Sequence, residues 1–505
     1  MALNDIIFVK GQGGLGRPLQ GEDFISGLCL FTASLPSGFS SSNRIKQFFS
    51  IADAEAAGIK GDNSDATAAT GTYLITAAGA TGDTITIKVT EIGGVVVNLG
   101  TYTKVAGDST IALLGASIAA FINAGTLTHG YSASFLTATL TLTAPKKLGV
   151  FINSGTPIAV TIVGTIAGTL TQFSGGVASK QANWHYHIAE FFRLNPKGQL
   201  YVGFFAVPGT YTFAEITTMQ NFANGKIRQI GVWKDAIFAI GDITVINTEV
   251  VNNCDGNHKP LSVVYAADIS ATSDLSTLTD LSTLTANKVS VVIGQDGAGL
   301  GAYLYAAYSK SITCLGAILG AISAAAVSDD IAWVGKYNMS NGYELDTLAF
   351  GNGVMVAASS QGFLNNLDNL RYIFPIKYVG IAGSYVNDSH CAIVVSSDYA
   401  YIENNRVIDK AIRGVYASVL PALNGPLQLN ADGTLTDTTI AYYESLAETN
   451  LIQMIRDSEL SAEAVAIDAT QNVLSTGKLI ISAKLLPIGV ARAIQVNIGF
   501  VTSII

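Results

Sequence analysis

The sequence has little charge for its length. Only 13% of its 505 residues are charged, against roughly 25% in soluble globular domains, and the mean hydropathy is +0.39. A chain of this kind cannot cover its surface with charged side chains, so we expect part of its exterior to be buried in an assembly. The net charge of -9 is spread without acidic or basic blocks. Direct binding to nucleic acid needs clustered Lys and Arg, so we expect none.

Cysteine is also scarce, and no long membrane segment is present. The four cysteines are far apart and follow no metal-binding spacing, which predicts buried apolar residues and a reducing compartment; they are Cys29, Cys254, Cys314 and Cys391. The first residues lack the basic and apolar segments of a signal peptide. The longest apolar run, residues 314–327, is too short to span a bilayer. We therefore expect a buried helix there and no membrane insertion.

Two glycine-rich loops lack the features of nucleotide sites. Residues 11–16 match G-x-G-x-x-G after an apolar run, but Arg17 and Pro18 follow, so no helix opens at the last glycine. Residues 294–301 follow a strand-like run without the Gly-Lys-Ser/Thr of a phosphate loop. We expect a connector in the first case and a tight turn between strand and helix in the second. No cofactor is predicted.

The sequence also shows no convincing catalytic or metal site. Asp388, Ser389 and His390 are adjacent, whereas nucleophile triads assemble from distant positions. His185 and His187 lie two apart in a segment that we interpret as a strand or turn, where both rings could face one way. The local sequence supplies no third ligand, so a structural role is favoured. We predict that the protein is not an enzyme and holds no metal.

Both ends of the chain are expected to form strands. Residues 478–486 are followed by a turn at Pro487 and by residues 492–501, in which apolar side chains alternate with Gln, Asn and Gly. Residues 2–10 form a second apolar, β-branched run. After Arg492 no charge protects the terminal strand from pairing with another chain. Either the two ends exchange strands between subunits, or they pair within one domain.

The length predicts about three domains, and composition places their boundaries. Residues 61–176 are rich in Thr, Gly and β-branched residues, with one expected helix at 109–123, and Gly-rich seams bracket them. They indicate a β-rich insertion that resembles accessory domains of phage structural proteins; a small β-sandwich of any origin is the alternative. Outside it, strands alternate with helices, which predicts an α/β domain with a largely parallel sheet. We expect strands at 24–31, 199–207, 227–233, 261–266 and 288–293 and helical segments at 45–57, 212–224, 235–251 and 274–285.

The last third of the chain carries a family resemblance. Two helices are expected at 401–420 and 439–458, followed by the terminal strands. The run 404–413 (NNRVIDKAIR), Gly433-Thr434-Leu435 and Gly477-Lys478-Leu479 resemble the contractile tail sheath proteins of bacteriophages and related contractile injection systems. Residues 294–296, 315–320 and 328–334 are similar to this family as well. The resemblance covers residues 1–58 and 180–505.

The resemblance implies the fold class and the function. The expected fold is α/β and α+β multidomain, with a sheath-type core and strand-exchanging arms. The domains are an N-terminal arm (1–20), a discontinuous α/β sheath domain (21–60 and 177–370), the inserted β-rich surface domain (61–176), a C-terminal sheath domain (371–490) and a C-terminal arm (491–505). The implied protein is a virion subunit, assembled in the host cytoplasm, that stacks as hexameric rings around a tail tube and contracts. Its implied partners are other copies of itself, the tube protein, and baseplate and tail terminator proteins.

Residue roles follow from the same resemblance. The inter-subunit arms fall on Leu3, Ile7, Val9, Ile494, Val496, Ile498 and Phe500. The receiving strand falls on Leu479, Ile481, Ala483 and Leu485. The tube-facing helix carries Glu444, Glu448, Arg456 and Asp457, for which a solvated helix face is the alternative. Two other classes stay open, a surface-layer protein and a nucleotide-binding α/β enzyme.

Overall fold

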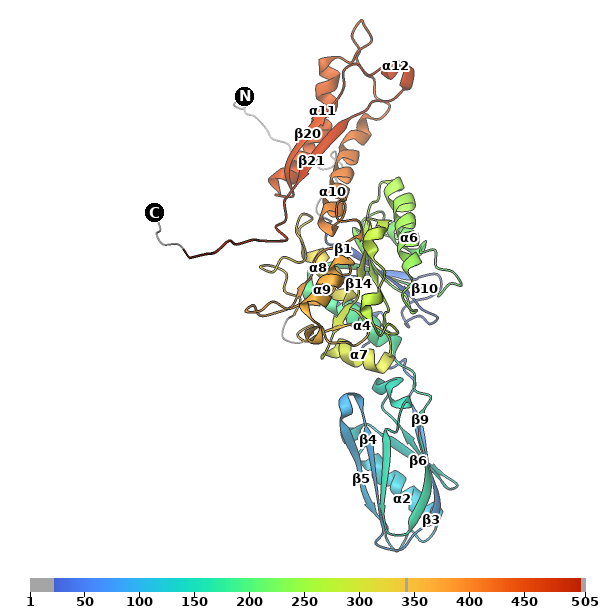
Figure 1. Ribbon diagram of the computed structural model, residues 1–505. Helices are drawn as coiled ribbons and strands as arrows, with labels where there is room; N and C mark the ends of the chain where they lie inside the picture. Colours follow the sequence, from blue (N-terminus) through green and yellow to red (C-terminus); the bar gives the residue numbers. More distant parts are fainter. Residues whose placement is uncertain (1–21, 341–343, 501–505) are drawn as a thin grey trace, which may run out of the picture.

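The computed structural model describes residues 22–340 and 344–500. Figure 1 shows three parts in a row: a central domain, a β-rich insertion at one end and a C-terminal unit at the other. The prediction of a mixed α/β chain with several sheets is confirmed. The predicted N-terminal strand and the glycine-rich loop at 11–16 lie outside the described residues.

The central domain is built on a six-stranded sheet in the order β14-β12-β11-β1-β10-β2. Its strands run parallel except the edge strand β2, which is antiparallel to β10. β1 is buried along its whole length, as parallel strands covered on both faces are. The strands are β1 (Ile25–Phe31), β2 (Ile45–Phe48), β10 (Gln199–Phe205), β11 (Gln229–Trp233), β12 (Ser262–Ala266) and β14 (Val289–Val292).

Helices and short strand pairs complete the central domain. β13 pairs with β19, β15 with β16, and β17 with β18, each as a small antiparallel ladder. The helices are α1 (Ile51–Ala56), α4 (Lys180–Leu194), α5 (Glu215–Phe222), α6 (Ile240–Glu249), α7 (Leu300–Tyr308), α8 (Leu315–Ala324) and α9 (Gln361–Asn369). The short strands are β13 (Thr285–Ala286), β15 (Gly294–Asp296), β16 (Leu348–Phe350), β17 (Pro375–Ile376), β18 (Tyr385–Val386) and β19 (Ala392–Ile393).

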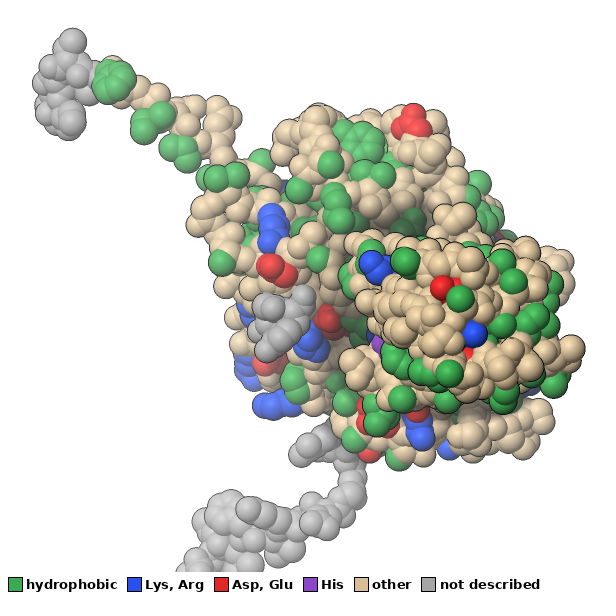
Figure 2. Space-filling view, turned by 90° about the horizontal axis from the view of Figure 1, so that it is seen from below, with side chains coloured by type: hydrophobic (Ala, Val, Ile, Leu, Met, Phe, Trp, Pro, Cys, Tyr) green, Lys and Arg blue, Asp and Glu red, His purple; other side chains and the backbone are tan. Residues whose placement is uncertain are grey.

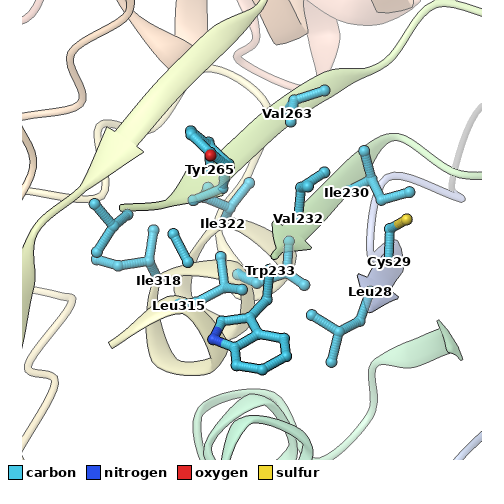
Figure 3. Packing of buried hydrophobic residues seen from close by; sticks show 14 of the residues in the cluster. Leu28, Cys29, Ile230, Val232, Trp233, Val263, Tyr265, Leu315, Ile318 and Ile322 are labelled. Carbon is cyan, nitrogen blue, oxygen red and sulfur yellow. The ribbon is translucent and has the colours of Figure 1, made fainter. Parts of the chain in front are cut away.

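Helix α8 occupies the centre of this domain. Its apolar side chains, among them Leu315 and Ile318, pack against the sheet (Figure 3). On its other side two glycines bring it against the backbone of α4: a Cβ on Gly316 lies 2.1 Å from the His187 carbonyl oxygen, and one on Gly320 lies 2.7 Å from that of Phe191. No helix in the described residues combines the length and apolarity that crossing a bilayer requires. The apolar run is therefore a core helix, as the sequence predicted.

The insertion has a hydrophobic core of its own. Two sheets, in the orders β6-β7-β3-β9 and β5-β4-β8, enclose α2 (Ile111–Ala124). The chain enters and leaves it side by side, because Thr67 and Val177 exchange both backbone hydrogen bonds at 3.0 Å. The other elements are β3 (Thr70–Ala78), β4 (Thr84–Thr90), β5 (Val96–Thr103), α3 (Thr126–His129), β6 (Ser132–Leu136), β7 (Thr139–Thr143), β8 (Ile158–Val163) and β9 (Ile166–Ser174).

The C-terminal unit consists of two long helices and a two-stranded sheet. α10 and α11 pack side by side, and the antiparallel pair β20–β21 lies beside them (Figure 1). Small apolar clusters hold the unit together, one around Leu451 and Met454 and another around Leu435 and Tyr443. The elements are α10 (Ile402–Val419), α11 (Asp437–Arg456), β20 (Leu460–Ala466), α12 (Val473–Thr476) and β21 (Ser482–Pro487).

Two helix predictions are wrong in detail. Residues 45–57 form β2 and then α1, because Ile45 and Phe48 bury themselves at the sheet edge and Ser50 caps a new helix by accepting a hydrogen bond from Asp53 N. The tandem at 274–285 forms two single 3₁₀ turns rather than a helix. Each turn begins at an Asp, Asp274 or Asp280, whose side chain accepts a hydrogen bond from the backbone two residues later.

Candidate functional site

The histidine pair lies on a helix, so its predicted strand or turn conformation is wrong. On α4, a separation of two positions corresponds to a rotation of about 200° around the helix axis, so the two rings point to opposite sides of the helix. His185 Nε2 lies 2.8 Å from Glu55 Oε1. His187 is fully buried, and burial lowers its pKa to about 3. Within residues 22–340 and 344–500, no group of three His, Cys, Asp or Glu side chains is arranged to hold a metal ion.

The glycine loop at 294–301 is filled by the chain's own carboxylates. Leu300 N at the start of α7 donates to Glu344 Oε2 at 2.9 Å, and a Cβ on Gly299 lies 2.3 Å from Asp296 Oδ2. Burial and the neighbouring Asp296 raise the pKa of Glu344 to about 7. An anionic phosphate at this helix end meets two carboxyl groups instead of free N–H donors. The loop therefore acts as the tight turn between strand and helix that the sequence favoured.

An apolar groove runs between α10 and the segment that leads into β21. Its volume is about 580 Å³. One wall contains all four residues of the predicted receiving strand, Leu479, Ile481, Ala483 and Leu485, which share one side of that segment. The opposite wall comes from α10 and the turn after it, where four large apolar side chains are 39–68% exposed: Ile412, Tyr416, Leu420 and Leu423. We call this feature the apolar groove.

The edge of β21 beside this groove lacks a partner. β21 pairs with β20 on one side, with Ala483 opposite Val465 and Leu485 opposite Glu463. On its other side no strand lies next to it in the part of the chain that the structure describes. Sheets usually need three or more strands with an apolar face to be stable independently. The C-terminal unit thus presents an open ladder of backbone donors and acceptors beside an apolar groove.

Residues 491–500, which we call the tail, leave the molecule as an extended segment. Figures 1 and 2 show the tail projecting from the body. Ile494, Val496, Ile498 and Phe500 are 81%, 76%, 95% and 109% exposed. From residue 493 to residue 500 no backbone hydrogen bond forms with the rest of the described chain. The predicted terminal strand is therefore absent from the single subunit, although its alternating pattern remains available for a partner.

Other predicted site residues have different positions. Leu3, Ile7 and Val9 lie outside the described residues. Glu444 and Glu448 are half-buried on α11 towards β20: Glu444 Oε1 accepts a hydrogen bond from Ile467 N at 3.0 Å, and the Glu448 charge helps burial to raise the pKa of Glu463. Arg456 and Asp457 are exposed at the C-terminal end of α11. The four charges do not share one face of the helix.

Sequence reasoning missed the second wall of the apolar groove. Ile412 and Tyr416 on α10 and Leu420 at its C-terminal end recur every four positions, which is the spacing of one helix face. This second apolar stripe was visible in the sequence beside the stripe that faces the core. The sequence does not show that this stripe lines a groove, because the opposite wall comes from β21 and the segment before it.

Family models match most of the chain. The DUF2586 N-terminal domain matches residues 81–390, and the DUF2586 C-terminal domain matches residues 398–504. The chain belongs to the DUF2586 family. No curated protein sequence matches it.

Several solved structures resemble the chain. The helical sheath of the anti-feeding prophage in its contracted state matches 63% of this chain and 81% of its own, at 14% identity and a TM-score of 0.44. The contracted PVC sheath of an extracellular contractile injection system matches 63% and 80%, at 14% identity and a TM-score of 0.41. A sheath tail protein from Listeria innocua matches 92% and 96%, at 9% identity and a TM-score of 0.38. These proteins are of the class that the sequence resembles.

Proposed function

We propose that the chain is the structural subunit of a contractile tail sheath. In this proposal, copies assemble as stacked hexameric rings around a tail tube, and contraction of the lattice drives the tube through a cell envelope. Each subunit lends its two arms to neighbours as added strands. The subunit works mechanically, so its chemistry is that of hydrogen-bonded edges and buried apolar surface.

One observation carries the proposal: the same chain has an unpaired apolar strand and an unpaired sheet edge. The tail offers alternating apolar side chains from Ile494 to Phe500, all strongly exposed. β21 offers an open edge beside the apolar groove. Addition of a strand to such an edge satisfies backbone groups and covers apolar side chains together.

The two surfaces match in length. β21 has six residues, which corresponds to about 20 Å of strand, and the seven tail residues 494–500 extend about 23 Å. A tail docked beside β21 places one row of its side chains over the groove wall formed by α10. Each strand added in this way contributes several backbone hydrogen bonds worth about 1 kcal/mol apiece net.

The position of Arg492 disfavours pairing of the tail with β21 of its own subunit. Arg492, at the start of the tail, is bound to the central domain through Asp388 and Asp330. A tail that folds back onto its own β21 must reverse direction within residues 488–493, and Arg492 is fixed in that stretch. From this anchor the tail points away from the C-terminal unit (Figure 1). Exchange with a neighbouring subunit is the arrangement that this geometry supports.

Further parts of the proposal concern the partners. The N-terminal arm, with Leu3, Ile7 and Val9, supplies the other exchanged strand. The tube protein contacts the C-terminal unit through α11, where Arg456 and Asp457 are exposed and Glu444 and Glu448 support the helix from the β20 side. The ends of the lattice contact baseplate and tail terminator proteins. The assembly forms in the host cytoplasm and becomes part of the virion or injection particle.

Electron microscopy of the purified protein tests this function. We expect the full chain to form long tubes, and a variant that ends at Ala493 to remain monomeric, because residues 494–500 form no backbone hydrogen bond with the rest of the described chain and their apolar side chains are strongly exposed. Circular dichroism and thermal unfolding of the shortened variant should match those of the unassembled full chain. Tubes of normal length from the shortened variant would exclude the tail as an exchanged strand. A full chain that never assembles would contradict the sheath proposal itself.

A further inference from the structure

Helix α10 buries an unusual number of charged side chains. Five of them are no more than 7% exposed: Glu403, Arg406, Asp409, Lys410 and Arg413. Charges at this depth are costly unless each one is paired, and apolar residues of similar size often stabilise a fold as well or better. Their presence on one helix therefore indicates that specific contacts matter more here than stability alone.

At its N-terminal end α10 binds Arg492, the second residue of the tail, which we call the root of the tail. Arg492 Nε donates to Asp388 Oδ1 and Oδ2 at 3.0 and 3.1 Å, and its Nη2 binds Glu403 of α10 and lies 3.2 Å from Asp330 Oδ2. The guanidinium stacks on the Tyr401 ring at 3.4 Å from the ring centroid. Burial opposes the charge of Arg492, but Asp388 and Glu403 outweigh burial and raise its pKa. Three carboxylates from three segments thus converge on one tail side chain.

Further along, α10 binds Asp23, which we call the root of the N-terminal arm. Asp23 lies two residues before the start of β1. Its Oδ2 lies 2.9 Å from Lys410 Nζ, and its Oδ1 accepts a hydrogen bond from Arg413 Nη2 at 2.8 Å. Burial opposes ionisation of Asp23, but Lys410 and Arg413 outweigh it and lower its pKa. A second ion-paired anchor on the same helix therefore holds the chain directly before β1.

The helix also connects these anchors to the receiving sheet and the central domain. Lys410 Nζ lies 2.6 Å from Glu459 Oε1, directly before β20. Asp409 Oδ1 lies 2.6 Å from Lys288 Nζ, directly before β14. Glu403 and Lys410 are seven residues apart, so the two anchors are separated by about 10 Å along a continuous helix. A helix held at several points along its length moves as one rigid piece.

We propose that α10 is a rigid link that fixes the roots of both arms at a constant separation, through Arg492 on Glu403 and through Asp23 on Lys410 and Arg413. The inference rests on the proposed function and adds a mechanical element to it. A pull on either exchanged strand is transmitted through an ion pair to α10, and through α10 to the other arm. Two neighbouring subunits are then joined through this helix rather than through two independent flexible segments.

Distance measurements between spin labels in the dilute, unassembled full chain test the link. Labels are attached at Glu22→Cys, next to Asp23, and at Ala491→Cys, next to Arg492; the four natural cysteines are buried and should not react. For the parent protein we expect one narrow distance distribution. Arg492→Ala and Asp23→Ala should each broaden it at least twofold, because each variant frees one root. Arg492→Lys, which keeps the charge, should give an intermediate width.

The controls separate this inference from the fold and from the sheath proposal. Lys197→Ala removes an exposed positive charge from the central domain and should leave the distribution unchanged. If Arg492→Ala fails to fold, the double variant Arg492→Ala with Glu403→Gln is measured in its place. The second substitution removes one of the carboxylates that Arg492→Ala leaves unpaired. A parent distribution as broad as that of the variants, or variants as narrow as the parent, would overturn the link. Neither result depends on assembly, so the sheath proposal is still decided by tube formation.

Discussion

The exchanged tail has two faces, which allows a sharp test of the assembly mechanism. Val496 and Ile498 lie on the apolar face and are 76% and 95% exposed in the single subunit. Replacing both by Ser should change the free energy of unfolding of the monomer by no more than about 0.5 kcal/mol, because exposed side chains without contacts contribute little. The matched control, Gln495→Ser with Asn497→Ser, changes the same strand on its other face.

The magnitude follows from the burial that docking requires. Burying one Val or Ile side chain is worth about 1.5–3 kcal/mol, so the double substitution should weaken each docked contact by about 3–6 kcal/mol. At 1.4 kcal/mol per factor of ten, the affinity falls by roughly a hundredfold to ten-thousandfold. Sedimentation and electron microscopy over a concentration series should show tubes for the parent and the control, but not for Val496→Ser with Ile498→Ser. Equal assembly by the two variants would refute docking through the apolar face.

Two further predictions concern the central domain. Gly316→Ala should lower the free energy of unfolding by about 3 kcal/mol, at the upper end for overpacking, because the new Cβ would lie 2.1 Å from the His187 carbonyl oxygen. The control is Gly362→Ala in α9, where the new Cβ would meet no atom within 4 Å. In chemical denaturation, this control should raise the free energy of unfolding by up to about 1 kcal/mol. Burial lowers the pKa of His187 to about 3 in the folded state, so between pH 6.5 and 3 the unfolded chain binds one more proton at this side chain than the folded chain does. The free energy of unfolding should therefore fall by about 1.4 kcal/mol per pH unit as the pH drops from about 6.5 towards 3. Denaturation curves of His187→Gln over this range should lose that slope, and an unchanged slope would assign it to other groups.

Local pattern was enough wherever neighbouring residues decide the structure. The apolar run around Gly316 and Gly320 was too short for a membrane and became the buried helix α8. Short apolar, β-branched runs placed the five parallel strands of the central sheet but not its edge strand β2. The helices at 401–420 and 439–458 appear as α10 and α11. In these segments the period of the side chains and the caps act over a few residues, so they can be read without knowledge of the fold.

Local pattern failed where a distant partner chooses between two outcomes. Residues 45–48 could have continued into the helix at 51–56, but the edge of β10 offers them a hydrogen-bonding partner. The histidines at 185 and 187 were predicted to lie on a strand or turn, whereas packing of α4 against α8 requires a helix there. Both decisions depend on contacts with segments more than a hundred residues away in the sequence.

The sequence by itself determined that residues 494–500 alternate between apolar and uncharged polar positions, because alternation is a local property of the residues. Only the tertiary structure decided that these residues extend from their own subunit without pairing with a strand of the described chain. Arg492 meets Asp330, Asp388 and Glu403 because three separate segments bring them to one point, and no sequence spacing encodes that meeting. The groove has two walls for the same reason, since α10 and β21 become neighbours only when the C-terminal unit folds.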